Sequence, residues 1–285
     1  MTRFLYVADT HLGANPMGYQ QQKGYPERLP EILFAICEYL SANGDVDFIL
    51  HGGDMIDSTT ENNIVAAAKH FDMAVPVYLC LGNHDLTTPD AVDFWGELAP
   101  QFFNGGTVNY MVLSEDCVIH VVPNHWGDDP FYWKDKQEAR FSSAQKVHFL
   151  RDVSIRPDLP HILLTHSPVY GLPVAQTGFS EPYHCANASF TEEIASLAAG
   201  HTSVRCILGA HTHMNMRVDH DGVEFVTGSA LVETPFEFKL FEVTSRRMEM
   251  STFSLSDALT FDGAYDVAKS FVQGREVDRS FIWEF

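Results

Sequence analysis

The eight residues Phe4-Leu-Tyr-Val-Ala-Asp-Thr-His11 carry the pattern that decides the fold of this chain. Residues 4–8 form an apolar run of the length of a buried strand, and Asp9 and His11 follow it directly. In an open α/β sheet, ligands bind outside the carboxyl ends of the strands. The stretch therefore predicts a strand that delivers a carboxylate and an imidazole to the edge of a sheet.

Four later segments repeat this arrangement of an apolar run followed by polar residues. We predict strands at residues 48–50, 75–81, 162–165 and 204–208. The polar residues at their ends are Asp54 in His-Gly-Gly-Asp, Asn83 and His84 in Leu-Gly-Asn-His-Asp, His166, and the pair His211 and His213. Taken alone, each motif is more often a turn, a helix cap or a structural histidine. Five of them in order, each at a strand end, indicate one shared site.

The segments between these strands favour helices. Helices are expected at residues 26–44, 61–73, 143–153, 191–199 and 263–272, and another with Thr88 as N-cap and Pro89 in its first turn. Ser189 and Glu192 form a possible capping box for the helix at 191–199. Further strands are expected at 117–122, 224–226, 239–243 and 247–253. The alternation predicts an α/β architecture of mixed sheets flanked by helices, and without a linker we expect one domain over residues 1–285.

The candidate ligands indicate which metals would bind. Two aspartates, at least four histidines and one amide form a mixed oxygen and nitrogen set, and no cysteine is close to the motifs. Such a set suits Zn, Mn, Fe, Co or Ni better than Mg or Ca. Two divalent ions and a bridging hydroxide would leave the cluster with about one positive charge beside Asp9 and Asp54, which favours a phosphate anion. We therefore expect two divalent transition-metal ions as cofactors.

The five motifs resemble the signature blocks of the calcineurin-like metallophosphoesterases. They read Asp9-Thr-His11, Gly53-Asp54-Met-Ile-Asp57, Gly82-Asn83-His84-Asp85, His166, and Gly209-Ala-His211-Thr-His213. The last block usually reads Gly-His-x-His, so Ala210 is a small departure that keeps both imidazoles. The blocks span residues 9–213, and the tail after them matches only in its strand-rich character.

The resemblance implies a four-layer α/β/β/α sandwich with a dinuclear metal site at the carboxyl ends of the strands. It assigns Asp9, His11 and His213 to one ion, Asn83, His166 and His211 to the other, and Asp54 to both. It also implies that His84 faces the phosphate and acts on the leaving group, that Asp57 orients His84, and that Asn83 contacts a phosphate oxygen. The implied activity is hydrolysis of phosphate esters by a water molecule that two ions activate.

The substrate is less well determined. Ser58 stands where Ser/Thr protein phosphatases of the family carry an arginine, which argues against that class. The first two blocks look like those of double-strand-break repair nucleases. The length, the Asn-His-Asp block and the segment Glu233-Thr-Pro-Phe look closer to small cyclic-nucleotide or glycerophosphodiester phosphodiesterases. We expect a small phosphodiester as substrate, with a nuclease as the alternative and a non-catalytic binding scaffold third.

The amino-acid composition limits the kinds of binding partner that we expect. The chain has 18 Lys and Arg residues and 38 Asp and Glu residues. Its net charge of −20 disfavours nucleic acid and anionic lipid as binding partners. No apolar run is long enough to span a membrane, no export signal is recognisable, and five scattered cysteines favour a reducing cytoplasm. The oligomeric state is not predicted. Specificity is expected in loops 13–25, 124–135 and 170–188, whose aromatic residues either stack on a substrate or pack the loops down. His125 and His184 in these loops either approach the site or are structural or solvent-facing. The aromatic residues include Tyr19, Tyr25, Trp126, Phe131, Trp133 and Tyr183.

Overall fold

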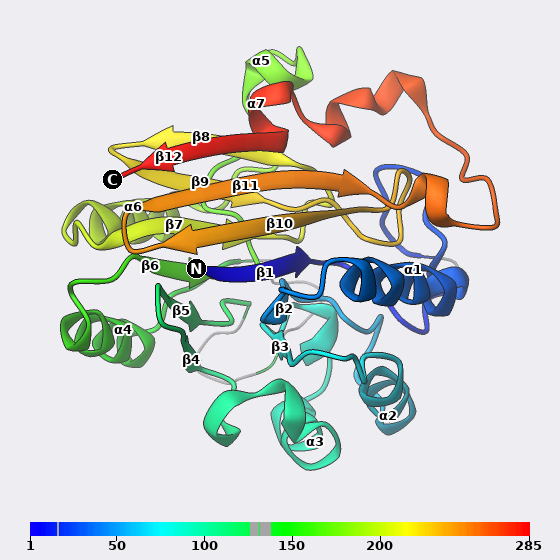
Figure 1. Cartoon of the computed structure of the whole chain (residues 1–285), viewed down its shortest axis with the longest axis horizontal. Coiled ribbons are helices and arrows are strands. Elements are labelled where there is room, and N and C mark those ends of the chain that lie inside the picture. The colour runs from blue at the N-terminus through cyan, green and yellow to red at the C-terminus, as the bar shows by residue number, and fades with distance from the viewer. Residues whose placement is uncertain (16, 126–130, 132–137) are drawn as a thin grey trace.

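Two six-stranded sheets stack face to face in the computed structural model, which describes residues 1–15, 17–125, 131 and 138–285 (Figure 1). The first sheet has the order β12 (Ser280–Glu284), β11 (Arg247–Ser254), β10 (Glu237–Thr244), β1 (Thr2–Val7), β2 (Phe48–His51) and β3 (Val77–Leu79). The second has the order β4 (Tyr110–Leu113), β5 (Val118–Val121), β6 (His161–Leu164), β7 (Val204–Gly209), β9 (Val223–Thr227) and β8 (Met216–His220).

Both sheets are mixed. Strands β1, β2 and β3 are parallel, and β10 to β12 extend that sheet in antiparallel pairs. In the second sheet β5, β6, β7 and β9 are parallel, while β4 and β8 are antiparallel edge strands. The parallel strands of each sheet end at the same edge, and the polar motifs that directly follow these strands are brought together there.

Helices cover the outer face of each sheet, which completes the four-layer α/β/β/α sandwich (Figure 1). Helices α1 (Leu29–Ala42), α2 (Glu61–His70) and α3 (Ala91–Leu98) pack with the first sheet, and α4 (Ser143–Ile155) and α6 (Ala188–Ala199) with the second. The shorter elements are η1 (Pro26–Arg28), η2 (His84–Leu86), η3 (Pro100–Phe102), η4 (Asn104–Gly106), α5 (Val174–Thr177), η5 (Ser256–Ala258), η6 (Val267–Gln273) and α7 (Glu276–Arg279).

Alternation along β6 explains the layers. Ile162 and Leu164 belong to the core cluster that also contains the first sheet, whereas Leu163 belongs to the outer cluster with Phe149 of α4 and Phe190 of α6. Successive side chains of a strand point to opposite faces, so a strand between two layers is apolar at every position. The uninterrupted apolar runs in the sequence therefore mark strands that are buried on both faces.

Three local expectations were wrong. Asp90 rather than Thr88 precedes α3, and Asn187, whose side chain accepts a hydrogen bond from the Phe190 amide, caps α6 ahead of the expected box at Ser189 and Glu192. The expected helix at 263–272 is instead a 3₁₀ segment, η6, whose first residues are bonded through their backbone to the Gln22 side chain. The edge strands β4, β8 and β12 were not predicted. No helix among the described residues is long and apolar enough to cross a membrane.

Candidate metal centre

The residues of the five motifs meet at the carboxyl edges of both sheets, on backbone of an unusual conformation. Backbone φ is 53° at Asp9, 43° at His11, 53° at Asp54, 66° at His211 and 59° at His213. Residues other than glycine rarely adopt these left-handed values, and such outliers cluster at functional sites. The chain therefore tolerates local strain at several strand ends in order to turn carboxylates and imidazoles toward one another.

Glycines make room for this convergence. A Cβ atom at Gly53, where φ is 109°, would collide with the His166 ring and lie 2.9 Å from the Cys80 carbonyl oxygen. A Cβ atom at Gly82 would collide with Asp54. The Gly-Gly-Asp and Gly-Asn-His motifs thus need their glycines because ring and backbone approach closely there.

One group of atoms converges between the two sheets from Asp54, Asn83, His166 and His211. His166 Nδ1 donates to the Gly52 carbonyl oxygen at 2.9 Å, so its Nε2 lone pair faces Asn83 Oδ1 at 3.1 Å and Asp54 Oδ2 at 3.2 Å. His211 Nδ1 lies 2.9 Å from the same Asn83 oxygen. Acceptors that face one another at such distances need a cation or a proton between them.

A second group converges from Asp9, His11 and His213. His213 Nδ1 donates to Glu233 Oε1 at 2.5 Å, which turns Nε2 toward His11 Nε2 at 3.1 Å and Asp9 Oδ1 at 3.8 Å. Asp54 Oδ2 is 4.0 Å from His11 Nε2, so Asp54 borders both groups. Among the described side chains, Asp9 Oδ2 is buried and has no hydrogen-bond partner. The side chains of the sequence motifs therefore form two groups, with Asp54 between them.

The spacing of these atoms fits metal coordination. Ligand bonds of about 2.1 Å place neighbouring ligand atoms roughly 3.0–3.4 Å apart. The distances of 2.9–3.2 Å in the group around His166 match this spacing, and the second group, at 3.1 and 3.8 Å, is slightly wider. Buried imidazole, carboxylate and amide atoms with an orphaned carboxylate oxygen are a donor set suited to divalent transition metals.

The close packing of carboxylates and imidazoles shifts the pKa values of these buried groups. Burial lowers the pKa of His166, but the Asp54 carboxylate outweighs burial and raises that pKa to about 9. Burial likewise lowers the pKa of His213, and Glu233 and Asp9 raise it to about 9. Burial lowers the pKa of His11 to about 4 and raises that of Asp9 to about 6. The carboxylates beside His166 and His213 therefore favour positive charge at the points where cations would bind.

His84 lies beside the two groups and is a quarter exposed. Its backbone N–H donates to Asp54 Oδ1 at 2.8 Å, and its ring stands edge-on to His11 with centroids 4.7 Å apart. Its Nδ1 donates to the Asp57 carbonyl oxygen at 2.7 Å, while the Asp57 carboxylate is 3.6 Å away. Asp57 therefore contacts His84 as expected, but its main-chain oxygen makes the hydrogen bond. The same carboxylate is 3.8 Å from His11 Nδ1.

Two residues at the site were not singled out as functional in the sequence. Glu233, whose carboxylate bonds His213, lies 20 positions beyond it, and no spacing rule connects them. His125 was left between a structural and a site role. The structure buries its ring with centroids 4.7 Å from His211 and 5.1 Å from His166, and burial, with the nearby His166, lowers its pKa to about 3. The sequence feature that could have placed His125 in the site is its position shortly after the predicted strand at 117–122.

The loop aromatics divide into two groups. The Tyr19 ring is 5.3 Å from the His213 ring, its hydroxyl bonds His184 Nε2 at 2.8 Å, and the Tyr183 ring is 4.4 Å from His184. Tyr25 instead packs on Phe236 and Phe261, and its hydroxyl accepts from Ala264. Trp126 and Trp133 lie outside the described residues, as does the rest of loop 124–135 apart from Asn124, His125 and Phe131. Tyr19, Tyr183 and His184 thus join His125 as described loop residues near the metal groups.

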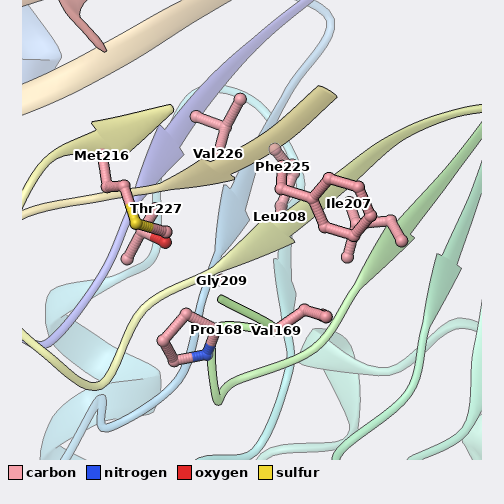
Figure 2. Close-up of a pocket in the computed structure, with 9 residues that line it drawn as sticks. All are labelled: Pro168, Val169, Ile207, Leu208, Gly209, Met216, Phe225, Val226 and Thr227. Atoms are coloured by element: carbon pink, nitrogen blue, oxygen red, sulfur yellow. The ribbon is translucent and has the colours of Figure 1, made fainter. Parts of the chain in front are cut away.

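The base of the site is tightly filled. Figure 2 shows Pro168 of the segment after His166 beside Gly209 at the end of β7, around a cavity of only about 10 Å³. A Cβ atom at Gly209 would lie 2.9 Å from Pro168 Cα. The other lining side chains are mainly apolar, including Ile207 and Phe225. The strand ends that carry His166 and His211 therefore rest on a packed core with room for one water molecule at most.

Two stacked mixed sheets with carboxylates and imidazoles at their strand ends define a metal-dependent phosphoesterase. The chain belongs to the calcineurin-like phosphoesterase family, whose sequence model matches residues 2–215. Membership of this family supports metal-dependent hydrolysis of phosphate esters. No curated protein sequence matched the chain.

Solved structures of this architecture resemble the chain at low sequence identity. A dimetal phosphatase from Danio rerio is 17% identical, with a TM-score of 0.66, and the match covers 89% of this chain and 96% of that one. Purple acid phosphatase PPD1 from yellow lupin is 16% identical, with a TM-score of 0.59, over 98% and 56%. GAP50, the anchor in the inner membrane complex of Plasmodium, is 11% identical, with a TM-score of 0.57, over 94% and 90%. At these identities the likeness concerns the fold.

Proposed function

We propose that this protein hydrolyses small phosphodiesters with two divalent transition-metal ions. The observation that carries the proposal is the convergence of two groups of buried acceptors on either side of Asp54. One ion would bind Asp9, His11 and His213, the other Asn83, His166 and His211, and Asp54 would bind both. Mn, Fe, Zn, Co or Ni suits this mixture of carboxylate, amide and imidazole atoms.

The bound ions would supply Lewis-acid polarisation of the phosphate and activation of water. Asn83 and His84 would face the phosphate, since they follow β3 side by side at the edge of the metal groups. The Asp57 carbonyl oxygen accepts the Nδ1 proton of His84 and thereby turns Nε2 away from Asp57. In the doubly protonated ring, Nε2 would donate its proton to the departing alkoxide oxygen.

The proposal of a small diester rests on the surroundings of the site. Ser58 provides no guanidinium clamp of the kind found in Ser/Thr protein phosphatases, and the net charge of −20 opposes long polyanions. Tyr19, Tyr183 and His184 offer ring faces beside His213 for an aromatic leaving group. All five cysteines are free thiols, two of them exposed, which fits the reducing cytoplasm that we also propose.

Turnover of bis(p-nitrophenyl) phosphate by purified protein with added Mn²⁺ tests the proposal. Rates should exceed those for p-nitrophenyl phosphate, and cyclic nucleotides and glycerophosphodiesters should be cleaved in preference to single-stranded DNA. Preferred cleavage of DNA would establish the nuclease alternative. Two bound ions without hydrolysis of any ester would indicate a non-catalytic binding scaffold. Absence of metal binding would refute the proposal.

A further inference from the structure

Glu233 is a buried carboxylate that contacts both the metal groups and a substrate-facing loop. It lies between β9 and β10 and is 2% exposed. One oxygen, Oε1, accepts from His213 Nδ1 at 2.5 Å. The other, Oε2, accepts from the backbone N–H groups of Gln21 and Gln22 at 2.9 and 2.6 Å. Each oxygen is thus committed to a different part of the molecule.

The loop held by Oε2, residues 17–25, is the Tyr19 loop. It runs antiparallel to the Glu233 segment, with Tyr25 N bonded to the Val232 carbonyl at 2.8 Å and Thr234 N to the Lys23 carbonyl at 3.1 Å. Tyr19 itself packs its ring against His213 and bonds His184. The position of the Tyr19 loop therefore depends on contacts that originate at Glu233.

The bond on Oε1 determines how His213 presents its other nitrogen. Because Nδ1 donates to Glu233, Nε2 is the nitrogen that faces Asp9 and His11 and is available to an ion. A cation on Nε2 draws electron density from the ring and makes Nδ1–H a stronger donor to the carboxylate. The counterpart ring, His166, donates to the neutral Gly52 carbonyl, so this link exists on one side of the centre only.

We propose that Glu233 is a positioning residue that couples binding of the ion at Asp9, His11 and His213 to the ordering of the Tyr19 loop. The inference rests on the proposed two-ion site. An ion at His213 strengthens the His213–Glu233 bond, Glu233 is then held in place, and its second oxygen fixes Gln21 and Gln22. By reciprocity, an ordered Tyr19 loop tightens binding of that ion.

Trypsin cleavage after the exposed Lys23 reports the order of the Tyr19 loop, and calorimetry with Mn²⁺ reports the affinity of each ion. In the wild type, Mn²⁺ should slow cleavage after Lys23 about tenfold, within the range of ordinary couplings. Cleavage after the exposed Arg246, in the turn between β10 and β11, serves as an internal control and should not respond.

Glu233→Gln removes the charge and offers an NH₂ group to one set of donors. It should weaken one of the two Mn²⁺ ions by about 10- to 100-fold, leave the other in place, and abolish the effect of Mn²⁺ on cleavage after Lys23. Glu224→Gln is the matched control, because Glu224 is equally buried at 2% but pairs with Arg217. This control should keep both affinities and the protection of Lys23.

Wild-type affinities and retained Mn²⁺ protection in Glu233→Gln would overturn the inference while leaving the two-ion site intact. If the wild type bound no Mn²⁺, the proposed function would fall, and the inference with it. If Glu233→Gln did not fold, Glu233→Asp would decide the question, because its shorter carboxylate cannot reach His213 and the Tyr19 loop together. Preserved coupling in Glu233→Asp would then refute the proposal.

Discussion

Asp54 borders both groups of acceptors, at 3.2 Å from His166 Nε2 and 4.0 Å from His11 Nε2. Asp54→Asn should therefore weaken both ions and abolish turnover. In the wild type, Mn²⁺ at 100 times its dissociation constant adds about 2.7 kcal/mol to the free energy of unfolding. Thermal unfolding with and without Mn²⁺, together with elemental analysis, should show that this gain is lost in the variant. A variant that keeps both ions and its turnover would exclude a bridging role.

His84 is expected to serve the leaving group without holding a metal ion. His84→Ala should keep both ions but lower kcat by roughly 10²–10⁴, the usual scale of general acid–base catalysis. The loss should be smaller for p-nitrophenyl esters than for alkyl esters, since p-nitrophenolate leaves without a proton. A set of aryl and alkyl phosphodiesters, with metal content measured on each sample, tests this. An equal loss on every ester with both ions retained would indicate phosphate binding instead.

Asp57→Asn provides a graded comparison with His84→Ala. The hydrogen bond to His84 Nδ1 comes from the Asp57 main-chain oxygen, which the substitution leaves in place. Only the carboxylate, 3.6 Å from Nδ1, loses its charge. The same kinetic series should therefore show a smaller loss of kcat than in His84→Ala, with the same dependence on the leaving group. A loss as large as that of His84→Ala would make the carboxylate the main partner of the ring.

At the level of whole elements, the turn after β2 depends on a glycine that has no room for a side chain. Gly53→Ala places a Cβ against His166 and the Cys80 carbonyl at a φ of 109°. We expect it to lower the free energy of unfolding by more than about 1 kcal/mol. Gly96→Ala is the control with the opposite sign, because Gly96 lies inside α3 with open space around it, and alanine favours helix by roughly 0.5–1 kcal/mol. Urea unfolding of both variants measures these changes, and equal stabilities would contradict the collision.

Strand β10 buries an amine, and this gives its stability a pH dependence. Burial lowers the pKa of Lys239 from 10.5 to about 7, with Glu237 and Asp278 raising it and Arg279 lowering it further. Between those values the unfolded chain holds one more proton than the folded chain, so stability rises with pH by up to about 1.4 kcal/mol per unit. Lys239→Met lacks this contribution. Urea unfolding from pH 7 to 10 should show that the free energy of unfolding rises more steeply with pH in the wild type than in the variant. Parallel pH dependences would refute the lowered pKa of Lys239.

Predictability from sequence differs between these elements for physical reasons. The strands that carry Asp9, Asp54 and His166 could be predicted because burial on both faces makes them uninterrupted apolar runs. Edge strand β8, with the burial pattern of one buried, two intermediate and two exposed residues, carries no such signal. The segment after residue 263 is held by Gln22, whose side chain bonds the backbone of Asp266 from 244 positions away, so its conformation does not follow from local propensity.

In the candidate site, too, some features have a local sequence signal and others depend on contacts between residues distant in sequence. Its motif residues are placed by the ends of consecutive strands, and their grouping follows from the parallel arrangement of those strands. Glu233 reaches His213 only through the path of the chain between β9 and β10, which no local pattern specifies. The five left-handed residues were likewise not predicted, since Asp and His do not favour that conformation strongly enough to mark it.

Across the whole molecule, the net charge of −20 should affect substrates in proportion to their own charge. Repulsion slows the encounter with a polyanion, and salt screens it over a Debye length of about 10 Å at 0.1 M. For single-stranded DNA, kcat/KM should therefore rise with added NaCl, while for bis(p-nitrophenyl) phosphate it should change little. Steady-state kinetics between 20 and 300 mM NaCl, roughly the range over which screening sets in, test this. A fall in kcat/KM with salt for DNA would reveal a basic path to the site.

The left-handed backbone at Asp9, His11, Asp54, His211 and His213 sets stability and function against each other. Each such residue costs of order 1–3 kcal/mol, and glycine would relieve most of that cost. Selection for thermal stability alone should therefore favour glycine at these positions and yield more stable proteins that no longer bind metal. Their persistence as Asp and His means that a screen for thermostable variants must include metal binding as a second criterion.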